Sequence, residues 1–89
     1  MNLKSYIKAL GPTRFARHLG IGTAYVNLLL TGARRPSGDY TMRIARAFAF
    51  AITPHEIRPD LYPSPWDGLP PDMAKKMMEA NSPPSADAA

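Results

Sequence analysis

Residues 12–30 of the chain read PTRFARHLGIGTAYVNLLL, a pattern typical of two short helices joined by a tight turn. Apolar residues recur at helical spacing around this turn and predict a buried stripe on each helix, and they are Phe15, Leu19, Ile21, Val26 and Leu29. Gly20 lies where the chain must leave the first helix through a left-handed conformation, which costs other residues roughly 1 kcal/mol or more. Ala16 is small where the helices must approach closely. The stretch predicts a helix-turn-helix unit, although a helical hairpin of a bundle has the same pattern.

A basic loop follows this unit and makes the pattern more specific. Residues 31–37 read TGARRPS, which combines a glycine stop, two arginines and a serine placed to cap the next helix. In these features the chain resembles the repressor family that includes the phage Cro and CI proteins. More narrowly, it is similar to the Cro-like group of YdaS-type antitoxins, whose domain closes with a segment like TPHEIRPDLYP at residues 53–63. The resemblance covers residues 1 to about 63 and implies an all-α, five-helix, lambda-repressor-like helix-turn-helix domain.

The flanking segments also have helical patterns. Residues 2–10 place Leu3, Tyr6, Ile7 and Leu10 on one face and predict a first packing helix, which Gly11 ends. The second helix opens at either Pro12 or Thr13, because proline is tolerated in a first turn. Ser37 is expected to cap a fourth helix, and its inward stripe is Thr41, Ile44, Ala45 and Phe48. An apolar run continues to Ala51, so the pattern does not determine where this helix ends.

Residues 53–56, TPHE, have the pattern of a capping box and predict a short fifth helix that stops before Pro59. His55 and Glu56 are therefore interpreted as capping residues, and His18 is interpreted as a surface residue. The proline-rich residues 59–71 are expected to form an extended strap held by Leu61, Tyr62 and Trp66. A short helix is predicted at residues 72–80, followed by a disordered tail from Asn81. We divide the chain into a helix-turn-helix domain at 1–63 and a proline-rich C-terminal tail at 64–89.

The third helix presents the side chains expected to read DNA. Its N-cap is Gly22 or Thr23, and with Val26 and Leu29 turned inward its outer face holds Thr23, Ala24, Asn27 and Leu28. We predict that these four contact bases, and the resemblance implies the same positions. An asparagine suits adenine, and apolar side chains suit the thymine methyl group. Leu28 departs from the polar residue usual in the family, so it faces either DNA or the core.

A second set of residues is expected to contact the DNA backbone, and it comprises Thr13, Arg14, Tyr25, Arg34 and Arg35. The resemblance implies that the start of the second helix meets phosphates. Tyr25 lies at the margin of the recognition helix, where it meets the backbone or a base. The two loop arginines carry the charge that phosphates require.

The charge distribution favours a polyanionic partner. The 89-residue chain has a net charge of +4, and residues 1–58 hold nine Lys and Arg against only two acidic residues. Neutralising phosphates with such side chains releases counterions and supplies affinity for DNA. The chain has no cysteine, no apolar run near the length of a membrane span and no signal-peptide core at its start, so we expect a cytoplasmic, nucleoid-associated protein of a bacterial host.

The sequence therefore predicts a DNA-binding transcriptional repressor of phage or prophage type that occupies an operator. The residues include no paired carboxylates or phosphate-binding loop, so no enzyme, cofactor or metal site is predicted. The alternative is an antitoxin that binds its own promoter and neutralises a toxin through the C-terminal part. One recognition helix reads few base pairs, so we expect a homodimer on DNA. Its contacts, each of which suits the core equally, are drawn from Phe48, Phe50, Ile52, Leu61 and Trp66.

Overall fold

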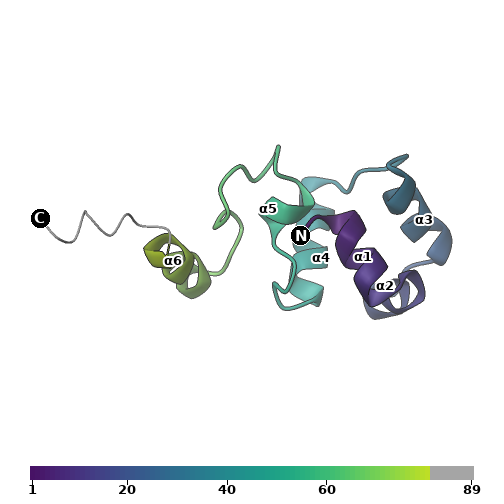
Figure 1. The fold of residues 1–89 in the computed structure, drawn as a ribbon, viewed down its shortest axis with the longest axis horizontal. Helices are drawn as coiled ribbons and strands as arrows, with labels where there is room; N and C mark the ends of the chain where they lie inside the picture. The colour runs from purple at the N-terminus through teal and green to yellow at the C-terminus, as the bar shows by residue number, and fades with distance from the viewer. Residues whose placement is uncertain (81–89) are drawn as a thin grey trace, which may run out of the picture.

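The computed structural model describes residues 1–80, which form six α-helices and no strands. They are α1 (Leu3–Leu10), α2 (Pro12–Leu19), α3 (Thr23–Thr31), α4 (Gly38–Ala47), α5 (Pro54–Ile57) and α6 (Pro71–Ala80). Figure 1 shows α1–α5 gathered in one body with α3 at one end, and α6 lying apart beyond a connecting segment. The expected all-α domain with five helices before residue 63 is confirmed. The tail expected from Asn81 lies outside the described residues.

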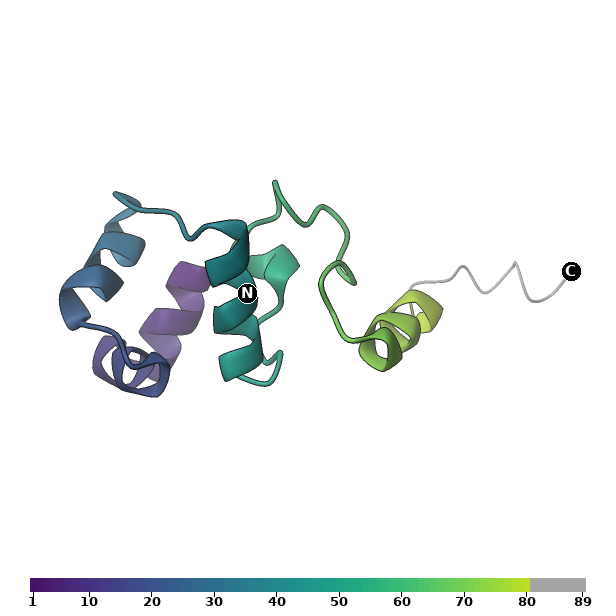
Figure 2. The same cartoon turned by 180° about the vertical axis from the view of Figure 1, so that it is seen from behind.

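The core is built from the inward stripes of α1–α4 together with residues around α5. Its buried apolar members are Leu3, Ile7, Phe15, Ala16, Leu19, Val26, Leu29, Ile44, Ala45, Ile52 and Ile57. Seen from behind in Figure 2, α4 runs through the middle of the domain, between the α3 end and α5. Burying these side chains supplies the main stabilisation of a domain this small. None of the described helices is long and apolar enough to cross a membrane.

Side-chain caps determine where three helices begin. Asn2 accepts a hydrogen bond from the Ser5 amide at 2.8 Å, so α1 begins one residue later than the apolar pattern indicated. The Ser37 hydroxyl accepts from the Tyr40 amide and caps α4 as expected. Thr53 and Glu56 form the predicted capping box of α5. The second helix opens at Pro12, the first of the two expected positions.

The end of α4, which the sequence pattern left open, is at Ala47. Phe48 is the C-cap of this helix, and its ring packs against the rings of Tyr6 and Phe15, with centroids 5.3 and 5.2 Å away. Ala49 and Phe50 then take left-handed backbone angles, with φ of 51° and 62°, and turn the chain back towards the core. Ile52 is fully buried as a result. Of the two roles left open for Ile52, dimer contact or core, the structure places it in the core.

The segment between α5 and α6 is a series of turns, and the expected extended strap is wrong. Backbone hydrogen bonds close turns from Arg58 to Leu61 and Tyr62, from Ser64 to Asp67, and from Trp66 to Leu69. The prolines supply no amide donors, but the residues between them do, and the Asp67 carboxylate also accepts from the Ser64 amide at 2.8 Å. Turns thus satisfy donors that an isolated extended chain would leave to water.

Contacts of Tyr62 and Gly68 hold this segment to the domain. The Tyr62 hydroxyl donates to the carbonyl of Gly38, and the Tyr62 carbonyl lies 2.7 Å from Nδ1 of His55. Gly68, with a φ of 77°, lies directly against Pro54 and Met42. In contrast, α6 buries none of its residues. The chain from α5 to Gly68 therefore packs on the domain, whereas α6 extends away from it.

Candidate nucleic-acid interface

The outward face of α3 carries the four residues predicted to contact bases. Thr23, Ala24, Asn27 and Leu28 are all exposed, while Val26 and Leu29 on the opposite face are buried. Leu28 keeps 39% of its surface exposed, so it lies outside the core. Within residues 1–80, the side chains of Thr23 and Asn27 form no hydrogen bonds that would occupy them. This face is uncharged and offers hydrogen-bonding and apolar groups together.

The turn before α3 determines which face points outward. Gly20 has a left-handed φ of 70°, and its amide donates to the last carbonyls of α2. The Ile21 amide donates to the Ala16 carbonyl at 3.0 Å, so the turn satisfies carbonyls at the C-terminal end of α2. Gly22, rather than Thr23, is the N-cap of α3, and it caps without a side-chain bond. The Thr23 hydroxyl thereby stays available on the outer face.

Contacts from α4 hold the two helices of this unit in place. Tyr25 of α3 is half-buried and meets Tyr40 edge to face, with ring centroids 5.6 Å apart. Burial, with the neighbouring Tyr25, raises the pKa of Tyr40, so the Tyr40 hydroxyl remains protonated near pH 7. Arg43 donates to the Leu19 carbonyl at the end of α2 and lies beside the Tyr40 ring. Tyr25 therefore packs mainly against α4, at the edge of the outward face.

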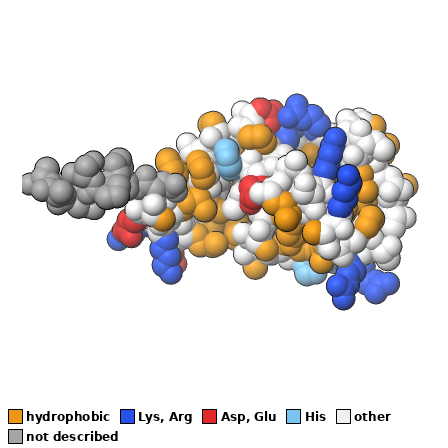
Figure 3. Space-filling model, in the orientation of Figure 1, with side chains coloured by type: hydrophobic (Ala, Val, Ile, Leu, Met, Phe, Trp, Pro, Cys, Tyr) orange, Lys and Arg blue, Asp and Glu red, His pale blue; other side chains and the backbone are white. Residues whose placement is uncertain are grey.

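Basic residues flank the uncharged face of α3 in the sequence and on the surface. Thr13 and Arg14 are exposed in the first turn of α2, and Arg34 and Arg35 are exposed in the loop after α3. On the face shown in Figure 3, Lys and Arg side chains gather over α1, α2 and this loop, where acidic side chains are few. Exposed cations on both sides of an uncharged helix face are an arrangement that can contact the two phosphate strands bordering a DNA groove.

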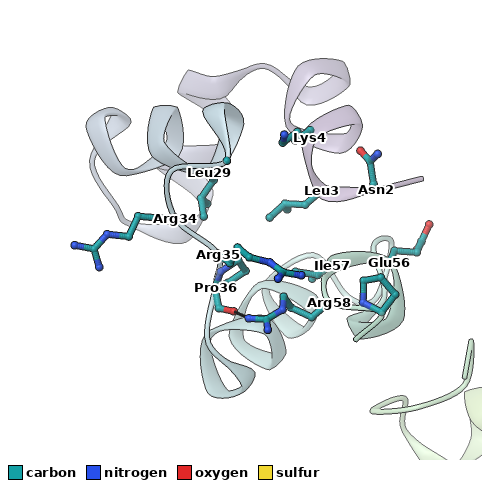
Figure 4. A pocket seen from close by; sticks show the side chains of 12 residues that line it. Asn2, Leu3, Lys4, Leu29, Arg34, Arg35, Pro36, Glu56, Ile57 and Arg58 are labelled. Carbon is teal, nitrogen blue, oxygen red and sulfur yellow. Dashed lines mark hydrogen bonds between the residues drawn. The ribbon is translucent and has the colours of Figure 1, made fainter. Parts of the chain in front are cut away.

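The loop after α3 has a defined shape. Gly32 ends α3 with a left-handed φ of 81°, and the Arg34 amide donates back to the Leu28 carbonyl at 3.2 Å. Pro36 is buried, which anchors the far end of the loop. Arg34 and Arg35 consequently leave the backbone in different directions. Figure 4 shows Arg34 pointing away from the domain and Arg35 reaching across the cavity beside it.

That cavity, of about 440 Å³, lies between the start of α1, the end of α3, the loop and the end of α5. Leu3, Leu29 and Ile57 form apolar walls, and Lys4 contributes a cation at its edge. Glu56 is also at the edge, where it pairs with the N-terminal amine at 2.5 Å. Burial opposes ionisation of Glu56, but hydrogen bonds from this amine and from Thr53 outweigh it and lower the pKa.

Sequence reasoning missed an arginine network behind the loop. Arg58 donates two hydrogen bonds to the Asp60 carboxylate, from Nε at 2.9 Å and from Nη2 at 2.7 Å. Its Nη1 donates to the Pro36 carbonyl and so ties the end of α5 to the basic loop (Figure 4). Arg35 reaches the same carboxylate at 3.3 Å. The pattern had marked Arg58 only as a helix stop, because no local spacing brings it to Pro36.

The two histidines make structural contacts. His18 stacks on Phe48 with ring centroids 4.5 Å apart, and its Nε2 lies at the Ala47 carbonyl. His55 contacts the Tyr62 carbonyl. No group of three or more His, Cys, Asp or Glu side chains within residues 1–80 is placed to hold a metal ion.

Comparisons with known proteins return no relative of this chain. No protein-family model matches it, and neither does any curated protein or solved structure that was searched. A function is therefore inferred from the side chains described above and from their placement.

Proposed function

We propose that this protein is a sequence-specific, double-stranded DNA-binding transcriptional repressor of the Cro/CI-like helix-turn-helix type, from a phage or prophage. The observation that carries the proposal is the outward face of α3, where Thr23, Ala24, Asn27 and Leu28 are exposed together. Amide, hydroxyl and methyl groups on an exposed helix are among the groups that read base edges directly in the major groove. Repression follows if the bound site overlaps a promoter.

The proposal assigns different roles to the face and to its flanks. Asn27 makes a bidentate contact to adenine, Thr23 donates or accepts at a base edge, and Ala24 and Leu28 contact thymine methyl groups. Arg34, together with Thr13 and Arg14 at the start of α2, contacts phosphates and positions the helix without reading sequence. Tyr25 lies at the boundary and contacts the backbone.

Selection of bound sequences from random DNA, followed by affinity measurements on variants, tests these roles. Asn27→Ala should weaken binding to the selected sequence by roughly 1–3 kcal/mol and relax preference at one position per half-site, with little effect on random DNA. Arg34→Ala should weaken binding to both DNAs and lower the salt dependence by about one phosphate contact. Lys75→Ala on α6 removes the same charge away from the interface and is the matched control.

Two results would contradict the proposal. If selection enriches no sequence, the exposed face of α3 is not a reading surface. If a folded Asn27→Ala protein keeps full sequence preference while Arg34→Ala loses it selectively, the roles are reversed and α3 does not lie in the groove. Circular dichroism of each variant establishes that it is folded.

The second candidate function is an antitoxin that also binds its own promoter. The observation that favours it is α6, which carries no buried residue and leaves Met73 39% exposed. A helix extended from a DNA-binding domain offers a separate surface for a protein partner. A pull-down from the native host with the full chain, compared with a chain that ends before Pro71, distinguishes the two functions. A toxin captured only by the full chain favours the antitoxin.

A further inference from the structure

One carboxylate, that of Asp60, is shared by two arginines that come from different parts of the chain. Arg58 holds it through two parallel hydrogen bonds of 2.9 and 2.7 Å. Arg35, from the loop after α3, approaches Oδ1 at 3.3 Å through one nitrogen. The same carboxylate oxygen thus joins the end of α5 to the loop proposed to meet DNA.

The two arginines are held unequally. The Arg58 side chain is only 15% exposed, and its remaining nitrogen is used on the Pro36 carbonyl. The Arg35 side chain is 63% exposed and has a single, longer contact. A paired, bidentate arginine is strongly held, whereas an exposed single contact is weak. Arg35 can therefore leave Asp60 while Arg58 keeps the carboxylate neutralised.

The Asp60 carboxylate remains ionised near pH 7. The hydrogen bond from Arg58 holds the pKa of the Asp60 carboxyl far below its ordinary value. A carboxylate oxygen and a phosphate oxygen offer a guanidinium the same kind of acceptor. When DNA lies against the loop, its phosphates and Asp60 present Arg35 with equivalent partners.

We propose that Asp60 is an intramolecular competitor of the DNA backbone, which holds Arg35 across the cavity in the free protein and releases it to a phosphate on binding. This inference rests on the proposed function. Arg35 then contributes to DNA affinity only after its contact with Asp60 is broken, and Arg58 stays in place as the anchor of the loop. Asp60 lowers the affinity for every DNA sequence because phosphates are present in all of them.

Replacing Asp60 with Asn tests the competition. Binding of the full-length protein to a fluorescent duplex of random sequence is measured by anisotropy over a series of salt concentrations. Asp60→Asn should tighten binding about twofold to fivefold at low salt, the range expected when an exposed ion pair no longer competes. The gain should shrink as salt rises, because salt screens both contacts. Asp72→Asn in the first turn of α6 removes an equal charge and should leave affinity unchanged.

The contribution of Arg35 is isolated by a double-mutant cycle. In an Arg35→Ala background, Asp60→Asn should give a clearly smaller gain in DNA affinity, because Arg35, the side chain that Asp60 would hold away from DNA, is absent. An equal gain in both backgrounds would show only general repulsion between Asp60 and DNA and would overturn the proposed competition. Unchanged or weaker binding by Asp60→Asn would also overturn it, and weaker binding would mean that Asp60 positions Arg35 for DNA.

The wild-type protein supplies an independent measurement in case Asp60→Asn loosens the fold. The Nε–H signals of Arg35 and Arg58 are followed by NMR as the duplex is added. The Arg35 signal should shift while the Arg58 signal stays unchanged, and the opposite pattern would overturn the proposal. If the wild-type protein binds no DNA, the proposed function fails and this inference with it; normal binding without these changes would overturn the inference alone.

Discussion

Gly68→Ala tests whether the turns after α5 are an integral part of the domain. Gly68 has a φ of 77°, and a Cβ added there would lie 2.8 Å from Cγ of Pro54 and 3.1 Å from Sδ of Met42. Pro54 is fully buried, and its ring cannot rotate away. The methyl group would therefore push the segment off the surface of α4 and α5.

The expected cost has two parts that the structure separates. A side chain in the left-handed conformation costs roughly 1–2 kcal/mol. Forcing a methyl group into a packed contact adds about 1–3 kcal/mol, so Gly68→Ala should lower the free energy of unfolding by roughly 2–5 kcal/mol. Gly20→Ala is the matched control, because Gly20 has a φ of 70° with nothing within 4 Å of an added Cβ. It should cost only the conformational part.

Urea unfolding monitored in two ways measures the difference. Circular dichroism reports the helices, and fluorescence reports Trp66, the single tryptophan, within the segment itself. Both signals should change in one transition in the wild-type protein if the segment folds with the domain. The reasoning is refuted if Gly68→Ala is no less stable than Gly20→Ala, or if Trp66 fluorescence changes at lower urea than the helical signal.

Two further predictions concern acid stability and assembly. The pKa values of Asp60 and Glu56 are lowered in the folded protein, so their contribution to stability is present above the ordinary carboxyl pKa of about 4 and is lost as pH falls through the folded values. Urea titrations should show that the free energy of unfolding falls towards acid pH. The fall should be less steep for Asp60→Asn and for Glu56→Gln, and the glutamine of the second variant can still cap α5. The protein should bind DNA as a dimer with half-sites about 10 base pairs apart. The two protomers should meet through exposed Leu61 or half-buried Trp66 and Phe50. Sedimentation at one protein per site, with an asymmetric footprint, would contradict this.

Local sequence chemistry determined most of the helical boundaries. Ser37 and Thr53 carry side-chain oxygens that satisfy the first amides of a helix, and both begin helices where expected. Gly20 permits the left-handed turn between α2 and α3. The spacing of Val26 and Leu29 also indicated which face of α3 is buried. These features depend on residues within one or two turns of each other, so the sequence alone is sufficient to predict them.

Tertiary contacts determined which apolar residues are buried and where α4 ends, which the apolar pattern leaves ambiguous. Phe48 and Ile52 lie in one apolar run, but α4 ends at Ala47, Phe48 packs on rings of α1 and α2, and Ile52 is buried completely in the core. Leu28 is as apolar as Leu29, and only the position of α3 on the core leaves it outside. An apolar side chain favours burial, but the neighbouring helices determine whether there is space to bury it.

The arginine network and the docking of Gly68 also required the three-dimensional structure. Arg58 meets Pro36 across 22 residues of sequence, and Gly68 meets Pro54 and Met42 through a turn that no local motif predicts. Residue types determined that the loop after α3 is basic. Whether Arg35 is free or held by Asp60 depends on where α5 ends in space. An ion pair acts over a few ångströms, and the spacing of residues along the sequence does not reveal which distant residues come that close.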